Sequence, residues 1–358
     1  MVKKILGFII TIIAFQATVA QTDSTNPAAP TSPVPTITGS VDVYYRYNFN
    51  DSKTGFTNNY TSFTNSQNSF ELGMASVRAD HSFGKASATI DLGFGRRAEE
   101  FAYGNPDHTT LFAVKQAYLS YAISDHFKLT MGKWATHIGY EVPDAYLNRN
   151  YSMDYMFTYG PFSHTGLKAD IVLGKKSGLM LGVANTTDNV TTVASRKYAI
   201  AQFSTGSSDD KVKAYLNYQG SYGGSFSTTQ FDAVVTAAIT SKFSIGYNGT
   251  IQSSKTDSTS SKSWWGSAVY LNVDPTSAFG ITLRAEYFDN KKAIVGLGTP
   301  IEGTSVFDVT LSPNFRVGNL TIIPELRLDA GKDEIFEKSD GSGTKTTVTG
   351  ILAATYHF

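Results

Sequence analysis

Few side chains in this sequence have the spacing that catalytic or metal-ligating groups usually show. The 358-residue chain has six histidines and no cysteine, which excludes disulfides, thiolate metal sites and cysteine nucleophiles. His137 and Glu141 are four residues apart, but no second ligand pair accompanies them, and no HExxH, GxSxG or GxxxxGK[ST] motif occurs. The acidic pair Asp333 and Glu334 would attract Ca²⁺ only weakly. We therefore expect no cofactor, no metal and no enzymatic activity.

The charged side chains instead follow a regular pattern. Between residues 37 and 49, the apolar Val41, Val43 and Tyr45 alternate with the polar Asp42 and Arg46. A period of two indicates a β-strand with one apolar and one polar face. If the polar faces line a lumen, the charged positions of its wall are Asp42, Arg46, Lys168, Asp170, Lys213, Arg284, Glu286, Glu325 and Arg327. Opposed rows of both signs would set up a transverse field and give weak ion selectivity.

The same alternation predicts about sixteen strands, although fourteen or eighteen remain alternatives. Their expected ranges are 37–49, 69–81, 84–94, 112–122, 126–134, 164–173, 178–185, 196–204, 211–219, 229–239, 242–252, 263–272, 279–287, 304–313, 319–329 and 346–358. Short and long connections alternate along the chain, which is typical of a transmembrane β-barrel and has no reason to occur in a soluble sandwich. Closing the sheet into a barrel gives every strand a hydrogen-bonded neighbour on both sides, and an apolar face directed outward suits contact with lipid. We predict an all-β, antiparallel, up-and-down transmembrane barrel around a water-filled channel.

The N-terminus carries export features. Lys3 and Lys4 precede the apolar run 5–15, and small residues lead to Ala20, so we expect a signal peptide over residues 1–20. Residues 21–36 are rich in Pro, Thr and Ser and predict a disordered leader, which places the barrel at 37–358. The formal net charge of zero argues against a nucleic-acid partner.

The last strand ends on an aromatic residue. Gly350, Leu352, Ala354, Tyr356 and Phe358 occupy alternate positions of the segment 346–358. A terminal aromatic on an amphipathic strand resembles the signal read by the outer-membrane assembly machinery. We expect Tyr356 and Phe358 to serve as that signal.

Residues 132–166 carry a family resemblance. The stretch contains Gly132-Lys133-Trp134, Gly139-Tyr140-Glu141, Asn148-Arg149-Asn150-Tyr151-Ser152 and Pro161-Phe162-Ser163-His164-Thr165-Gly166. With the opening residues 39–45 and Leu92-Gly93-Phe94-Gly95, it resembles the OmpL-like β-barrel porins of Gram-negative bacteria, notably Bacteroidetes. This resemblance implies an outer-membrane porin, with outer-membrane lipids and small polar solutes as its partners. Trimers are common at this strand count, so we regard a homotrimer as open.

The longest connection, residues 135–163, is the candidate constriction. It carries Glu141, Asp144, Arg149 and Asp154, and it is the third long loop, which constricts the channel in other sixteen-stranded porins; this is an analogy. An external cap or a subunit contact is the alternative. Two other functions stay open: a barrel enzyme of lipase or protease type, whose catalytic groups would meet only in space, and a binding or adhesion barrel that acts through its loops.

Overall fold

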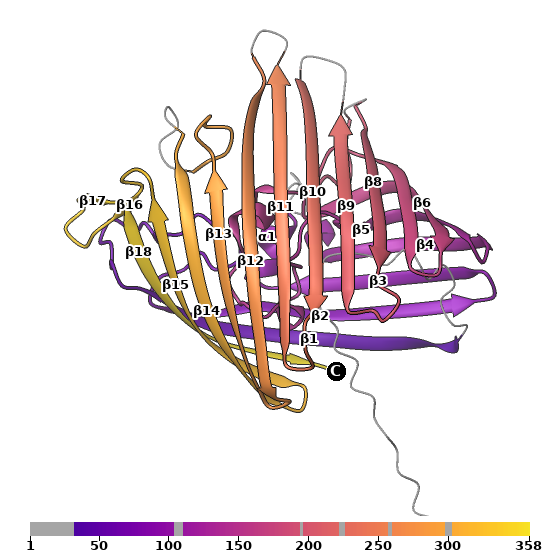
Figure 1. Cartoon of the computed structure of the whole chain (residues 1–358), viewed down its shortest axis with the longest axis horizontal. Helices are drawn as coiled ribbons and strands as arrows, with labels where there is room; N and C mark the ends of the chain where they lie inside the picture. Colours follow the sequence, from indigo (N-terminus) through magenta and orange to yellow (C-terminus); the bar gives the residue numbers. More distant parts are fainter. Residues whose placement is uncertain (1–31, 104–109, 194–195, 222–225, 257–259, 298–302) are drawn as a thin grey trace, which may run out of the picture.

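Sixteen antiparallel strands close into one barrel in the computed structural model (Figure 1). The structure describes residues 32–103, 110–193, 196–221, 226–256, 260–297 and 303–358, so the expected signal peptide and residues 21–31 of the leader lie outside the described residues. The barrel strands are β1 (Ser32–Asn48), β2 (Ser69–Phe83), β3 (Ala86–Phe94), β4 (Val114–Ser124), β5 (Phe127–Ala135), β6 (Ser163–Gly174), β7 (Ser177–Ala184), β8 (Tyr198–Gly206), β9 (Val212–Ser221), β10 (Phe226–Ala238), β11 (Phe243–Thr256), β12 (Lys262–Thr276), β13 (Phe279–Asp289), β14 (Ser305–Val317), β15 (Leu320–Gly331) and β18 (Thr346–His357). The predicted closed sixteen-stranded barrel is confirmed.

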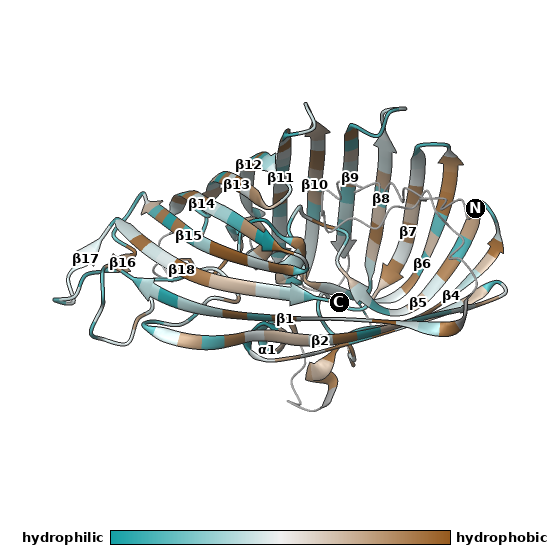
Figure 2. Ribbon diagram, turned by 90° about the horizontal axis from the view of Figure 1, so that it is seen from below, coloured by the Kyte–Doolittle hydropathy of each residue, from teal (hydrophilic) through white to brown (hydrophobic). Residues whose placement is uncertain are grey.

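The faces of the strands are arranged inside out relative to a soluble protein. Val41 and Val43 are exposed on the outer surface, whereas Asp42 and Arg46 on the same strand are buried inside. Figure 2 shows hydrophilic and hydrophobic positions alternating along the strands in the same way. The alternation follows from the pleat, which points successive side chains to opposite faces. An apolar outer surface with a polar interior suits a barrel embedded in lipid.

The two ends of the chain close the barrel. β1 pairs with β18 from Ser40↔His357 to Asn48↔Thr349. Beyond this ladder, the Gly39 amide donates to the Phe358 carbonyl (3.0 Å), and the Phe358 amide donates to the Gly39 carbonyl (2.9 Å). The side chains of Tyr356 and Phe358 lie on the outer surface. The C-terminal strand is therefore fully paired up to its last residue.

Three differences from the expected strand boundaries concern β1 and β9 to β12. β1 begins at Ser32 rather than at residue 37, because residues 32–38 extend past the end of β18 and pair only with β2. An edge of this kind tolerates Pro33 and Pro35, which have no N–H to donate. The expected long connections 220–228 and 253–262 are also wrong: β9 to β12 are longer than predicted, which leaves only residues 222–225 and 257–261 between strands. In Figure 1, β10, β11 and β12 reach furthest toward the end of the barrel where these two connections lie.

The two ends of the barrel have different connections. Residues 84–85, 125–126, 175–176, 277–278 and 318–319 form tight links at one end, here called the short-turn end. The opposite, long-loop end carries the α-helix α1 (Arg96–Phe101), the 3₁₀ helix η1 (Thr110–Ala113) and a small hairpin of β16 (Phe336–Glu337) and β17 (Gly343–Thr344). Among the described residues, no helix has both the length and the hydropathy to cross a bilayer.

Candidate functional site

The connection between β5 and β6 lies inside the barrel. This inner segment, residues 136–162, contains the 3₁₀ helix η2 (Ala145–Leu147) and the α-helix α2 (Tyr155–Tyr159). Near its start, the Gly139 amide donates to Asp232 of β10 (3.1 Å). At η2 the segment reaches the short-turn end, where the Tyr146 ring stacks on that of His357 with centroids 4.9 Å apart. The segment therefore runs through the lumen between the two ends of the barrel.

Two wall carboxylates fix the backbone of the inner segment. Glu325 accepts hydrogen bonds from the amides of Tyr151 (2.7 Å) and Ser152 (3.0 Å). Glu286 accepts hydrogen bonds from the amides of Tyr155 (2.8 Å) and Met156 (3.0 Å). Buried backbone N–H groups outside regular structure need such partners, because an unpaired one costs free energy comparable to a lost hydrogen bond. Both predicted wall residues therefore anchor the segment.

A buried network of arginines and acids joins the segment to β13, β14 and β15. Arg284 contacts Glu141 of the segment (2.7 Å) and Asp308 (3.1 Å), and its guanidinium also donates to the Ser152 carbonyl (2.7 Å). Arg327 contacts Asp308 (2.8 Å) and Asp329 (2.7 Å). These side chains are almost fully buried. Charges withdrawn from water have to be paired in this way.

The expectation of opposed rows of charge across open water is wrong. Apart from Arg46 and Lys213, the predicted acids and bases touch one another or the inner segment, because the segment fills the middle of the lumen and excludes the water that would solvate separate charges. Lys168 lies 3.7 Å from Asp170 on the same strand. The Asp42 carboxylate lies 3.8 Å from the Arg97 guanidinium and accepts a hydrogen bond from the Tyr151 hydroxyl (2.5 Å).

The remaining predicted residues lie in separate places. Asp144 pairs with Lys115 (2.5 Å), and Arg149 pairs with Asp274 of β12. Asp154 caps α2 by accepting the Phe157 amide (2.6 Å) and also accepts the Tyr270 hydroxyl (2.7 Å).

Two wall residues complete the predicted set. Arg46 donates to the Thr57 carbonyl (3.0 Å) in the first long loop. Lys213 is half-buried and lines a cavity.

His137 and Glu141 do not meet. The His137 imidazole contacts the Tyr218 carbonyl (3.1 Å), whereas Glu141 contacts Arg284 on another part of the wall. His137 lies instead beside His164, with ring centroids 5.0 Å apart. In the described part of the chain, no group of three or more His, Cys, Asp or Glu side chains is placed to hold a metal ion.

Aromatic side chains cover the inner segment toward the long-loop end. Phe157 and Phe162 of the segment pack against Phe63 and Phe101 from two other long loops, and all four are buried. Arg97 of α1 lies 4.8 Å from the centre of the Phe63 ring and 4.9 Å from that of Tyr151. The expectation of a water-filled channel is therefore wrong for the middle of the lumen and for the part toward the long-loop end, where these side chains are packed.

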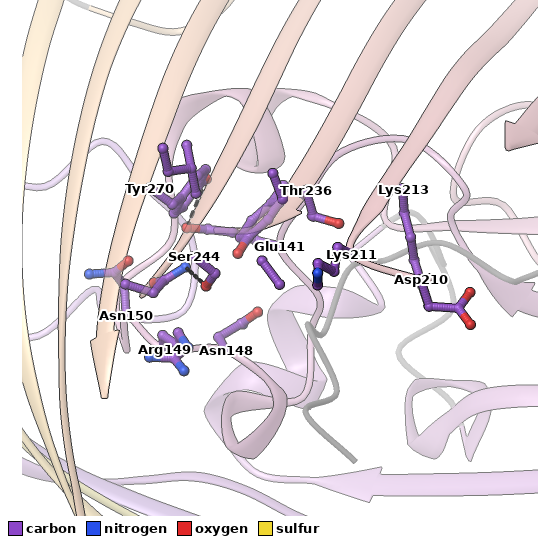
Figure 3. A pocket seen from close by; sticks show the side chains of 15 residues that line it. Glu141, Asn148, Arg149, Asn150, Asp210, Lys211, Lys213, Thr236, Ser244 and Tyr270 are labelled. Atoms are coloured by element: carbon purple, nitrogen blue, oxygen red, sulfur yellow. Dashed lines mark hydrogen bonds between the residues drawn. The ribbon is translucent and has the colours of Figure 1, made fainter. Parts of the chain in front are cut away.

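Open space remains toward the short-turn end. One cavity of about 80 Å³ lies between the inner segment and β9–β12 and is lined by Tyr140, Arg149, Lys213 and Asn272, among others (Figure 3). A second, of about 450 Å³, is lined by Tyr146, Arg149, Lys242, Asp274, Asn314 and Arg316. A third, of about 210 Å³, lies beside Lys115 and Asp144. Polar side chains predominate around all three.

Sequence reasoning missed several residues of this site. Asp308 and Asp329 share the inward parity of their strands with Arg284 and Arg327, so alternation alone could have identified them. Arg97 had no such signal, because it lies on a short helix in a loop. Asp188, in the β7–β8 loop, accepts the amides of Phe162 and Ser163 (2.7 Å each) and could not be found from local sequence.

Comparisons with known proteins agree with this architecture. The family model described as "Putative beta-barrel porin-2, OmpL-like" matches residues 35–358. Among solved structures, the anion-selective porin from Comamonas acidovorans is 11% identical with a TM-score of 0.59, covering 91% of this chain and 99% of that one.

Two further solved structures are similar at comparable identity. OprB of Pseudomonas putida is 11% identical with a TM-score of 0.58, covering 90% of this chain and 94% of that one. The outer membrane channel DcaP of Acinetobacter baumannii is 12% identical with a TM-score of 0.57, covering 92% of this chain and 100% of that one. At such low identity these likenesses show the fold. A search of curated proteins finds no match.

Proposed function

The chain belongs to the OmpL-like β-barrel porin-2 family, and from that premise we propose that it lets small hydrophilic solutes diffuse passively across the outer membrane. The observation that carries this proposal is the inverted barrel, whose apolar residues face outward while polar residues surround open cavities inside. A polar lumen favours hydrated solutes over apolar ones, and selection occurs at the narrowest point by size and charge.

The inner segment is the constriction in this proposal. Glu325 and Glu286 hold its backbone, and the Arg284 network holds its centre, so the aperture is set by a fixed element. Because packing fills the middle of the lumen, we expect a narrow pore with a low size limit. Solutes would pass beside the segment along β9–β12, where Lys213, Thr236 and Ser244 line open space (Figure 3).

Further parts of the proposal concern assembly. Export through a cleaved signal peptide at residues 1–20 fits the basic and apolar pattern there. Tyr356 and Phe358 end a paired strand with both rings exposed, which supports their proposed role as the signal read by the assembly machinery. The short-turn end would then face the periplasm and the long-loop end the outside. A homotrimer remains part of the proposal.

Liposome swelling tests the function directly. Vesicles that contain the purified protein should swell in small solutes such as glycine or a pentose, and swelling should fall steeply with disaccharides. Equal rates for all sugars would contradict the narrow constriction. No swelling in any solute, together with no ion conductance in a planar bilayer, would contradict the pore itself. Hydrolysis of phospholipid or peptide by the same preparation would support the enzyme instead.

A further inference from the structure

Two of the cavities meet at Arg149. The side chains of Asn148 and Arg149 line both the space beside β9–β12 and the larger space toward β14 and β15. Figure 3 shows Arg149 and Asn148 on one side of the smaller cavity and Lys211 and Lys213 on the other. The combined space is open toward the short-turn end, so the groups that line it are reached from that side.

Basic side chains outnumber acidic partners around this space. Arg149 and Arg316 share the single carboxylate of Asp274, which Arg316 contacts at 2.9 Å. In the described ranges of the chain, neither Lys213 nor Lys242 forms an ion pair. The other acids that line the space are committed elsewhere: Glu141 to Arg284 and Asp210 to Lys176.

The two arginines, Arg149 on the inner segment and Arg316 on β14, are held in place by surrounding residues. Their side chains are only 23% and 27% exposed, respectively, and Asp274 is 6% exposed. Arg316 reaches Asp274 across Gly280 of β13, where an added Cβ would lie 2.2 Å from the Asp274 carboxylate and 2.7 Å from the Arg316 guanidinium. The Asn314 amide also donates to the Arg149 carbonyl (3.0 Å), which fixes the base of that side chain.

We propose that Arg149, Arg316 and Lys242 form a binding site for a small anion that carries a carboxylate or phosphate group, with Lys213 extending the positive field into the smaller cavity. The guanidinium N–H groups not used by Asp274 match the paired oxygens of such an anion. The hydroxyl groups of Thr321 and Thr355 supply further polar contacts. This inference names the solute class of the proposed pore. Transport of that solute rests on the proposed function, whereas binding at the site does not.

The acids deeper in the lumen do not oppose this site. Glu286, Asp308 and Asp329 are buried and hydrogen-bonded to the inner segment or to arginines, so they do not line the open space. A cavity with walls of low dielectric constant focuses the field of the charges at its surface. The open space toward the short-turn end therefore carries a net positive charge, and the expectation of weak ion selectivity gives way to an anion preference.

The test uses the full-length protein in planar bilayers under a KCl gradient. The reversal potential should show chloride preferred over potassium, and Lys242→Gln should lower that permeability ratio by about twofold or more, since it removes one exposed charge of the site. Lys338→Gln is the matched control: it removes the same charge from the exposed β16–β17 hairpin at the long-loop end and should leave the ratio unchanged. Potassium succinate and potassium phosphate, added on the short-turn side, should reduce chloride current, and their relative potency decides between carboxylate and phosphate.

The outcomes distinguish a failure of the anion site from a failure of the proposed pore. A conducting protein that prefers potassium, or that responds alike to both lysine substitutions, would overturn the anion site and leave the pore standing. If no current is found, calorimetric titration of the detergent-solubilised protein with succinate and phosphate still measures binding. Weaker binding by Lys242→Gln, and again by Arg316→Gln, would support the site, and unchanged binding would refute it.

Discussion

Arg284 holds the inner segment and the wall together at a single guanidinium. It contacts Glu141 and Asp308 and donates to backbone carbonyls of the segment, with no exposed surface. We expect Arg284→Met to destabilise the protein by about 3–5 kcal/mol, because it leaves buried acids without a partner. Urea unfolding in detergent micelles measures this loss. Arg96→Met is the control, since Arg96 forms an exposed pair with Glu100 and should cost under about 1 kcal/mol. Equal losses would mean that the buried network contributes no more to stability than an exposed ion pair.

Asp188 makes the C-terminal end of the inner segment sensitive to pH. Burial raises the pKa of this loop carboxyl from 3.8 to about 6, although the amides of Ser163 and Phe162 and the Tyr103 hydroxyl donate to it. The folded protein therefore holds this proton more tightly than the unfolded chain. The contribution of Asp188 to stability is largest below about pH 4, declines as the pH rises, and is lost above about pH 6.

Hydrogen exchange at the Phe162 and Ser163 amides checks this dependence. Once corrected for intrinsic rates, protection should be greater at pH 5 than at pH 7.5 in the native protein. Asp188→Asn cannot titrate but keeps an acceptor, so its protection should not change with pH. A pH dependence that survives in this variant would show that another group is responsible.

At the scale of elements, the strands could be predicted and residues 135–163 could be named as the candidate constriction, but the path of that segment could not be predicted. Alternation fixed the facing of residues such as Val43 and Asp42, because the pleat couples sequence position to surface directly. Strand ends are less certain: β1 starts five residues early, where its prolines fall in an irregular stretch of the pairing with β2, between Ser32↔Ser82 and Thr36↔Asp80. The path of residues 136–162 depends on acceptors such as Glu325, which lie far away in sequence.

A covalent tether tests whether the inner segment is a fixed constriction. Asn150 of the segment donates to the Ser312 hydroxyl of β14 (2.7 Å), and the chain has no cysteine to interfere. In the double variant Asn150→Cys/Ser312→Cys, we expect the same single-channel conductance before and after oxidation, because the segment is already held there by Glu325 and Glu286. Current that appears only after reduction would show that the segment has to move for transport.

At the scale of the whole molecule, closure explains why the site was harder to predict than the fold. Period two predicts that Asp308 and Arg327 both face inward, but only the closed barrel packs the 136–162 segment against this pair and removes the water. Thr282 illustrates the consequence. It faces inward as expected, yet it is fully buried and donates to Asn272 (2.8 Å), so an arginine there would meet packed protein instead of water.

The whole proposal requires that the apolar outer surface of the barrel borders lipid. A substitution at Leu283 tests this. This residue lies in the middle of β13 with its side chain directed outward, opposite Leu311 of β14. Leu283→Arg should weaken insertion by about 2–4 kcal/mol if the residue lies near the bilayer midplane, because a charged side chain would enter hydrocarbon. Ser244→Arg is a better control than a change at Thr282, since Ser244 lines an open cavity. Urea titration of both variants folded into lipid vesicles should show the loss only for Leu283→Arg. Equal losses, or a loss confined to Ser244→Arg, would mean that the apolar face does not border lipid, and the pore would then have no membrane to cross.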